Sequence, residues 1–302
     1  MSDPSPPSPL QIGIAFGILY IVWGTTYLAI QIGVLNENLP PLLFAGTRIG
    51  SAGLILLALQ LARRQKLRMA RADFAGIAVG ALLLFVLGNG IISIALKTVA
   101  SGESAVLAAT TTLWVAAAAM VMPGGDRLRI VGWLGLLLGF VGVVVIKLPA
   151  LREQGFSFAS NLGPWLVLCS AAAWGVGTVL LRKATINLPR LTSAGWQMAL
   201  GGGLMFLLGL LRGETPPETI SAASIGAFLY LLVFGSLTAF VAFNWLLEHV
   251  PAPRVTTYAY VNPLVAVLLG TWLHDEDMAP TLILGMLVIL AGLFLVRHGT
   301  RK

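Results

Sequence analysis

Aromatic and polar side chains share one side of the first long apolar segment of the chain. Tyr20, Trp23 and Tyr27 follow one another at spacings of three and four residues, and Gln31 continues the row after four more. This spacing places them on one face of a helix. Their rings and polar groups predict a cavity wall that binds a small molecule. Packing between helices is the alternative interpretation.

A second tryptophan lies at a corresponding position further along the chain. Trp174 follows Trp23 by 151 residues, both are near the middle of an apolar segment, and Thr178 lies one helical turn after Trp174. Tryptophan in a membrane helix normally prefers the ends of the span. Two central tryptophans at corresponding positions therefore favour a cavity that both of them line.

Further candidate binding residues interrupt other apolar segments. Thr111 and Asn262 are also related by 151 residues, and Tyr258 lies one turn before Asn262. Pro263 removes a backbone donor and can leave a carbonyl group free, and Asn89, between two glycines, predicts a similar irregular point. The alternative role of these polar side chains, above all of the threonine, is hydrogen bonding between helices.

One charge lies well inside an apolar segment. Arg48 is about 8 residues from the outer end of the second segment, or roughly 12 Å at ~1.5 Å per residue. A charge at such depth is costly and marks a functional site by default. It could hold the carboxylate of a bound molecule or tie its helix to loop carbonyl groups. Gln197 follows Arg48 by 149 residues at the corresponding position, so the charge has no repeat mate.

Composition shows that these residues must be positioned within a lipid bilayer. Of 302 residues, 57% are hydrophobic and 10% are charged, and the mean hydropathy is +0.89. Soluble domains carry about 25% charged residues and rarely expose large apolar patches. A soluble enzyme, a secreted disulfide protein and a disordered chain are therefore excluded. Cys169 is the single cysteine, and its apolar neighbours predict a buried thiol.

Ten apolar segments approach the length of about 20 residues that a membrane helix needs. They are residues 10–33, 41–62, 74–96, 103–122, 128–148, 163–181, 192–211, 224–247, 253–273 and 278–297. Membrane β-barrels instead show alternation over about 10 residues. The first segment lacks the basic flank and cleavage site of a signal peptide. We therefore predict an all-α integral membrane protein with ten transmembrane helices.

Basic residues divide unequally between the two sets of loops. One set contains Arg63, Arg64, Lys66, Arg68, Arg71, Arg127, Arg129, Arg182, Lys183, Arg190, Arg254, Arg297, Arg301 and Lys302, and the other contains Lys97, Lys147, Arg152 and Arg212. An excess of Lys and Arg marks cytoplasmic loops. This predicts a multi-pass protein of the cell (inner) membrane with both termini in the cytoplasm.

The two halves of the chain repeat each other. Trp23, Gly24, Gly135 and Gly142 recur as Trp174, Gly175, Gly285 and Gly292, at offsets of 150 or 151 residues. Each repeat holds five segments, and an odd number inverts the second repeat in the membrane. Inverted repeats are typical of transporters, whose substrate site lies near the midplane between the repeats.

The repeats define the predicted organisation of the chain. It comprises a cytoplasmic tail at 1–9, a first five-helix repeat at 10–148, an external linker at 149–162, an inverted repeat at 163–297 and a cytoplasmic tail at 298–302.

Glycines form a stripe on the fifth segment and an echo of it on the tenth. The stripe is Gly132, Gly135, Gly139 and Gly142, and the echo is Gly285 and Gly292. Small residues at this spacing let helix backbones approach closely. We predict packing of the fifth helix against the tenth. A homodimer through these helices is the second interpretation, so the chain is either a monomer or a homodimer.

Several motifs resemble those of a known family. They are residues 21–27 (IVWGTTY), 45–48 (AGTR), 88–90 (GNG), 258–263 (YAYVNP) and the closing pattern Glu276, Gly285 and Gly292. On these residues the chain resembles, over 10–297, the ten-helix EamA branch of the drug/metabolite transporter superfamily. The resemblance implies export of amino acids or other metabolites. The chain departs from the family pattern at Thr112, where the first repeat often has proline.

Other chemistries find little support in the sequence. A phosphate-binding GxxxxGK[ST] loop is missing, and the three histidines are scattered at segment ends. We predict no cofactor, no metal and no nucleic-acid partner. Residues 274–277 (HDED) are predicted to form a solvated turn and the N-cap of the tenth helix.

These observations lead to one predicted function and two alternatives. We predict an exporter of small metabolites, most strongly amino acids, that works by alternating access. Export of drugs or other metabolites is the alternative within transport. An intramembrane lipid-modifying enzyme is the alternative of another class, but no nucleophile, base or metal site stands out for it.

Acidic residues lie at the ends of the predicted spans. Asp73, Glu103 and Glu248 come nearest to the membrane interior. Proton-driven transporters use titratable groups within their spans. The sequence therefore predicts transport without obligatory proton coupling.

The predicted topology can be tested with reporter fusions. Fusions after residues 40, 156 and 217 are expected to report an external location, because the loops there carry few basic residues. A compartment-specific enzymatic reporter measures this directly. An internal signal at two of the three sites would contradict the inverted repeat.

Overall fold

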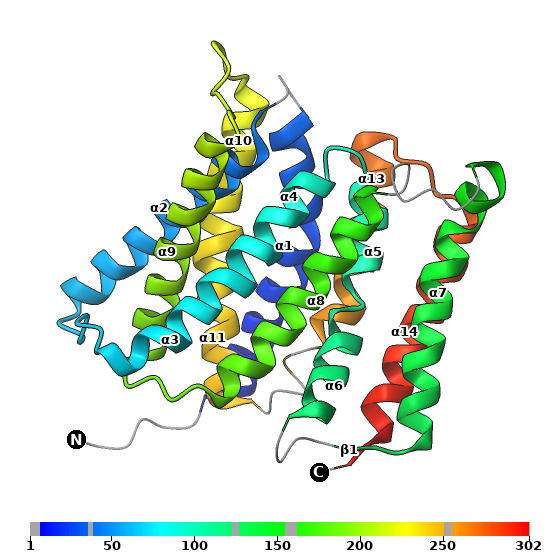
Figure 1. The fold of residues 1–302 in the computed structure, drawn as a ribbon, viewed down its shortest axis with the longest axis horizontal. Helices are drawn as coiled ribbons and strands as arrows, with labels where there is room; N and C mark the ends of the chain where they lie inside the picture. The colour runs from blue at the N-terminus through cyan, green and yellow to red at the C-terminus, as the bar shows by residue number, and fades with distance from the viewer. Residues whose placement is uncertain are drawn as a thin grey trace.

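The computed structural model describes residues 7–35, 39–122, 127–154, 162–250, 255 and 257–301, and its helices follow the predicted segments (Figure 1). They are α1 (Pro9–Leu35), α2 (Pro41–Ala62), α3 (Arg71–Gly80), η2 (Ala81–Gly90), α4 (Ile91–Ala95), α5 (Ser101–Ala108), α6 (Thr111–Val121), α7 (Ile130–Gln154), α8 (Leu162–Lys183), α9 (Arg190–Leu211), α10 (Ala222–Tyr230), η3 (Leu231–Thr238), α11 (Ala239–His249), α13 (Tyr258–His274) and α14 (Pro280–Gly299). Eight of the described helical stretches are long and apolar enough to cross a membrane, and Pro280–Val296 adds a shorter one.

Two corresponding spans, one in each half of the chain, contain the π-helical stretches η2 and η3. A π-helical turn inserts an extra residue into the hydrogen-bond pattern and is frequent at functional sites. Asn89, where the sequence predicts an irregular point in the helix, lies in η2. The fourth span is also divided, into α5 and α6, by a turn at residues 109–110 that contains no proline.

Some boundaries differ from the predicted ones. α7 continues through Pro149 to Gln154, six residues beyond the predicted end, since residues 150–154 (ALREQ) are good helix formers. Two short strands, β1 (Arg127–Leu128) and β2 (Thr300–Arg301), pair antiparallel and join the start of α7 to the end of α14. Residues 155–161 of the predicted linker, and the basic residues Arg254 and Lys302, lie outside the described residues.

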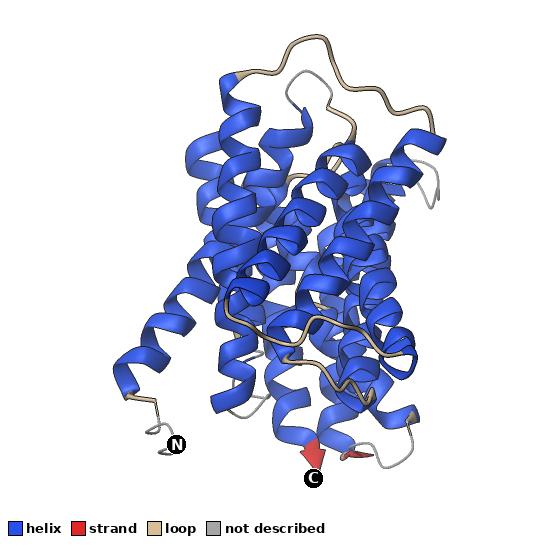
Figure 2. Cartoon of the chain, turned by 90° about the vertical axis from the view of Figure 1, so that its left-hand side faces the viewer, coloured by secondary structure: helices blue, strands red, loops and turns tan. Residues whose placement is uncertain are grey.

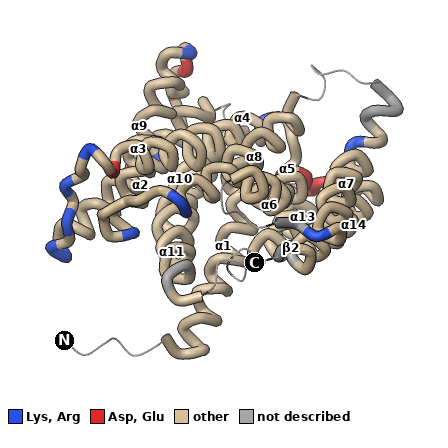
Figure 3. The backbone as a smooth tube through the Cα atoms, turned by 60° about the horizontal axis from the view of Figure 1, so that its bottom comes forward, with Lys and Arg blue, Asp and Glu red and all other residues tan. Residues whose placement is uncertain are grey.

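Both described ends of the chain lie on the same face of the helix bundle. α1 begins and α14 ends at the lower face in Figure 1, and Figure 2 shows the same arrangement from the side. The link between α2 and α3 carries several Lys and Arg residues, which Figure 3 shows in blue. Both ends lie on one face because the chain crosses the bundle an even number of times.

Helix contacts repeat between the two halves with their roles exchanged. α1 packs against α13, and α8 packs against α6. In the same way, α1 contacts α10, η3 and α11, while α8 contacts α3, η2 and α4. α2 meets η3, and α9 meets η2. Contacts that exchange in this way are those of two repeats related by a pseudo-two-fold axis, as the sequence predicts.

Glycines let corresponding helices from the two repeats touch along their backbones. A Cβ atom added at Gly142 would lie 2.8 Å from the carbonyl oxygen of Gly285, and one at Gly135 would lie 2.6 Å from that of Gly292. The glycine stripe of α7 therefore packs against α14 within one chain. α2 and α9 form the other such pair, at the opposite side of the bundle (Figure 1).

Carboxylates from the second repeat cap the beginnings of two helices in the first. Glu214 accepts a hydrogen bond from the backbone N–H of Leu43 at 2.9 Å, and Glu276 accepts from Ser101 at 2.7 Å and Gly102 at 2.9 Å. An anion at a helix N-terminus also interacts favourably with the helix dipole. The prediction that the acidic turn caps the tenth helix is therefore wrong for Glu276. Asp275, in the left-handed conformation, turns the chain back so that Glu276 reaches α5.

The outer surface of the bundle is apolar. Leu137, Leu204 and Leu268 are among the many exposed large hydrophobic side chains. The thiol of Cys169 is exposed on this surface, so the prediction that it is buried is wrong. An apolar run in a membrane helix does not distinguish a side chain facing lipid from one facing protein.

Two neighbouring glycines of α9 provide a test of the α2–α9 contact. The Cβ atom of an alanine at 202 would lie 2.8 Å from the carbonyl oxygen of Gly46, whereas one at 203 meets nothing within 4 Å. Overpacking costs about 1–3 kcal/mol, and both changes raise helix propensity by up to ~1 kcal/mol. Gly202→Ala is thus expected to lower the apparent melting temperature in detergent, and Gly203→Ala to leave it unchanged or raise it. Equal melting curves for the two variants would contradict close α2–α9 packing.

Candidate functional site

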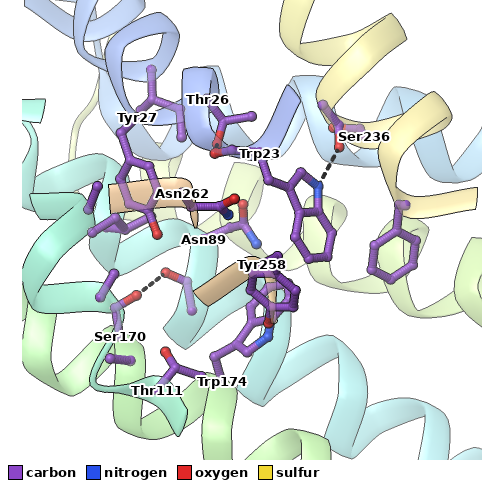
Figure 4. A pocket seen from close by; sticks show the side chains of 18 of the residues that line it. Trp23, Thr26, Tyr27, Asn89, Thr111, Ser170, Trp174, Ser236, Tyr258 and Asn262 are labelled. Atoms are coloured by element: carbon purple, nitrogen blue, oxygen red, sulfur yellow. Dashed lines mark hydrogen bonds between the residues drawn. The ribbon is translucent and has the colours of Figure 1, made fainter. Parts of the chain in front are cut away.

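A cavity of about 150 Å³ lies in the middle of the bundle, between the two repeats (Figure 4). Helices of both halves contribute to it. Of the predicted binding residues, Trp23, Tyr27, Arg48, Asn89, Thr111, Trp174, Tyr258 and Asn262 line it. The structure therefore brings together residues that are up to 239 positions apart in the chain.

Two of the predicted binding residues do not line the cavity. The hydroxyl of Tyr20 forms a hydrogen bond with Thr257. The hydroxyl of Thr178 donates to the carbonyl oxygen of Trp174 in its own helix at 2.8 Å. Both side chains lie on the predicted helical face, but each hydroxyl forms a hydrogen bond within the protein and neither residue belongs to the cavity lining.

Aromatic rings form the apolar wall of the cavity around Trp23. Its ring centroid lies 6.2 Å from that of Trp174, at an interplanar angle of 88°, and 5.0 Å from that of Tyr258, at 89°. Edge-to-face pairs of this kind are favourable beyond the area that they bury. The indole N–H of Trp23 donates to the carbonyl oxygen of Gly235 in η3 at 3.3 Å. Trp23 therefore connects the apolar wall to the second repeat.

The Trp-Gly pairs explain why both tryptophans face inward. A Cβ atom at Gly24 would lie 2.6 Å from that of Val265, and one at Gly175 would lie 2.8 Å from that of Trp114. Val265 follows Trp114 by 151 residues, so the two contacts are repeat mates. Each glycine lets its helix approach a neighbour closely, and this contact fixes the direction of the tryptophan before it.

Several polar groups that line the cavity are bound to backbone carbonyl groups. Ser170 donates to the carbonyl oxygen of Gly88 at 2.8 Å, and the amide of Asn89 donates to that of Leu84 at 3.2 Å. With its amide nitrogen as the donor, Asn262 reaches the carbonyl oxygens of Tyr258 and Tyr20, both at 3.1 Å. These bonds satisfy backbone groups in or beside the irregular stretches, which hydrocarbon cannot do.

Arg48 is the one charged residue among the described residues that line the cavity. Its side chain is 3% exposed. Its Nη1 donates to the hydroxyl of Ser236 at 3.0 Å, and its Nη2 donates to the side-chain oxygen of Asn89 at a long 3.4 Å. Its Nε is buried without a hydrogen-bond partner. Arg48 thus bonds to side chains of η2 and η3, and not to the loop carbonyl groups that the alternative interpretation expected.

Sequence reasoning missed several residues that line the cavity. They include Thr26, Phe85, Ser170, Ser236 and Phe240. Ser170 could have been found, because it lies one helical turn before Trp174 on the same face. Ser236 lies in an apolar run with no periodic polar pattern. Phenylalanines are common throughout a membrane protein, so the sequence does not distinguish those that line a cavity from those that face lipid.

A metal site does not emerge from the described part of the chain. Within it, no three His, Cys, Asp or Glu residues come together as metal ligands do. The described lining combines neutral polar groups, aromatic rings and one guanidinium group. This lining offers both hydrogen-bonding groups and apolar surface to a small molecule.

Comparisons with known proteins point in one direction. Residues 11–148 and 161–297 each match the EamA-like transporter family. The chain is 35% identical over 285 residues to "Uncharacterized inner membrane transporter YedA" of Escherichia coli, covering 93% of this chain and 89% of the relative. It is 26% identical over 295 residues to "Uncharacterized transporter YvbV" of Bacillus subtilis, covering 95% and 91%.

One solved crystal structure shares the fold. It superposes with a TM-score of 0.67 at 22% sequence identity and covers 95% of this chain and 97% of that chain. At this identity the likeness establishes the fold alone. The two matched halves and the shared fold agree with the pseudo-two-fold seen in the helix contacts.

Proposed function

Because this chain belongs to the EamA-like transporter family, within the drug/metabolite transporter superfamily, we propose that its central cavity carries small metabolites, most strongly amino acids, out of the cell. The chain is a membrane transporter and not an enzyme. The observation that supports the proposal is the cavity between the inverted repeats, whose lining combines aromatic rings with hydrogen-bonding groups. The Escherichia coli relative is named an inner membrane transporter, which supports an inner-membrane location for this chain.

The cavity suits a small molecule with an apolar side chain. Trp23, Trp174 and Tyr258 offer ring faces and edges to an apolar group, while Asn89 and Thr111 offer polar groups to its other end. We expect the two repeats to rock against each other along the α2–α9 and α7–α14 contacts. This movement would expose the cavity to one side of the membrane at a time.

Export of permanently cationic drugs is the second candidate, and the cavity disfavours it. A cation would meet the positive charge of Arg48, because the described lining contains no Asp or Glu to balance that charge. Neutral or anionic metabolites other than amino acids fit better as alternatives.

Uptake by proteoliposomes tests the proposed function. Purified protein is reconstituted, and the entry of a panel of labelled amino acids is compared with that into protein-free vesicles. Saturable entry of at least one amino acid is expected. Entry of labelled drugs or other metabolites alone would favour the other transport candidates.

The aromatic wall generates the first functional prediction. Trp23→Ala and Trp174→Ala are each expected to reduce initial transport rates about 10-fold, since each removes an aromatic contact surface worth over ~1 kcal/mol. Expression and melting temperature are expected to change much less. Trp272→Ala is the control, because this tryptophan is 78% exposed on the outside of the bundle. Full activity in both cavity variants would show that the two rings only pack helices together.

The positions of the acidic side chains generate a prediction about coupling. Asp73 accepts from the backbone N–H of Asn187 at 2.8 Å, and Glu103 pairs with Lys147 at 2.8 Å, so both are held at helix ends. The side chain of Glu248 lies outside the described residues. Substrate is therefore expected to follow its own gradient, without obligatory proton exchange.

Proteoliposomes with an imposed pH gradient and equal substrate on both sides measure this coupling. No net accumulation is expected. The control is the same vesicles with a protonophore, which dissipates the pH gradient. Sustained accumulation that the protonophore abolishes would contradict the prediction and identify a boundary carboxylate as a proton carrier.

A further inference from the structure

We propose that Arg48 and Asn89 together form the recognition site for the α-carboxylate and α-ammonium groups of an amino acid. This inference rests on the proposed function and names the headgroup chemistry of the same cavity. The site is built from a guanidinium group that is already buried, already oriented and only partly bonded.

The proposal rests on the edge of the guanidinium group that Nε and Nη2 form, which is only partly hydrogen-bonded. Nη1 is occupied by the hydroxyl of Ser236 at 3.0 Å. Nε has no partner, and Nη2 has only the 3.4 Å contact to Asn89. The N–H groups of Nε and Nη2 lie parallel on one edge of the planar group. This edge is the one that binds both oxygens of a carboxylate.

Burial makes an anionic partner favourable. Arg48 is 3% exposed, and no acidic residue stands among the described residues that line the cavity. A buried charge without a counter-ion is costly, and a ligand that supplies the opposite charge removes much of that cost. Lysine, a point charge without the planar edge, could not replace the bidentate contact.

The side-chain oxygen of Asn89 completes the headgroup site. A carboxylate on Nε and Nη2 would replace the long contact of Asn89, while the bond to Ser236 on Nη1 would remain. The side-chain oxygen of Asn89 would then accept a hydrogen bond from an ammonium group next to the carboxylate. The amide nitrogen of Asn89 stays bound to the carbonyl oxygen of Leu84 at 3.2 Å, which keeps that oxygen in place.

Binding at this edge would also act on both repeats. Asn89 belongs to η2 in the first repeat, and Ser236 belongs to η3 in the second. In the structure, the guanidinium group of Arg48 connects both stretches. The occupied cavity would connect η2 to the guanidinium group through the ligand. Occupancy of the headgroup site therefore changes what holds the two π-helical stretches together.

Matched ligand pairs test the proposal in proteoliposomes that contain the full chain. Labelled L-phenylalanine, L-leucine and L-threonine are each competed with the corresponding amine, which lacks the carboxylate, and with the corresponding acid, which lacks the ammonium group. Amines are expected to compete at least about 10-fold more weakly than the amino acids, and acids to compete with intermediate strength. Competition by amines as strong as by amino acids would overturn the inference while transport itself stands. No binding of any member would refute the proposed function and, with it, the headgroup site.

Variants assign the preference to the two residues. Arg48→Lys keeps the charge and is expected to weaken the binding of amino acids about 10- to 100-fold. Asn89→Leu is expected to make amino acids and the corresponding acids bind equally strongly. Thr178→Val is the control, because Thr178 is not among the residues that line the cavity and its hydroxyl bonds to a backbone carbonyl group of its own helix. Ligand-induced shifts of the melting temperature in detergent report binding even where a variant no longer transports. Unchanged ligand preference in the Arg48→Lys protein would overturn the assignment of the carboxylate.

Discussion

Hydrocarbon offers no hydrogen bonds, and this constraint explains most of the polar contacts in the bundle. Every backbone group that a helix end or an irregular turn releases must find a partner within the chain. Glu214 and Glu276 supply such partners at the beginnings of α2 and α5. Ser170 and Asn89 supply them for carbonyl groups in η2. The binding cavity lies where these needs concentrate, so the same side chains that satisfy the backbone surround the space for a ligand.

The second general feature is the use of glycine where the repeats meet. Side chains cannot separate α7 from α14, because backbone atoms already touch at Gly135 and Gly142. Ile146 packs against Gly285 and Ile289 packs against Gly142, so glycines and branched side chains interlock along this contact. The central helices, in contrast, interlock through large rings such as Trp23. Backbone contacts between the repeats thus lie at the two sides of the bundle, and contacts between large rings lie at its centre.

The sequence predicts the helices and the repeat well because composition and glycine spacing act over long stretches. It predicts the cavity residues where a polar or aromatic side chain stands out against apolar neighbours, as Trp174 and Arg48 do. It fails where the decisive factor is a local bond. The hydroxyl of Thr178 bonds to its own helix, and Glu276 reaches a different helix from the expected one. Phe85 lines the cavity without any mark in the sequence that separates it from lipid-facing residues.

The repeats share a fold, yet they are not copies of each other. A perfect two-fold would give the conformations open to either side of the membrane the same free energy, because the symmetry exchanges them. Arg48 corresponds to Gln197, and Pro263 corresponds to Thr112, so that degeneracy is broken in this chain. Of these four residues, Arg48 and Pro263 line the cavity, so the asymmetry between the repeats extends to the proposed site. Under the proposed alternating access, sequence divergence between the duplicated halves makes the inward-open and outward-open conformations differ in free energy.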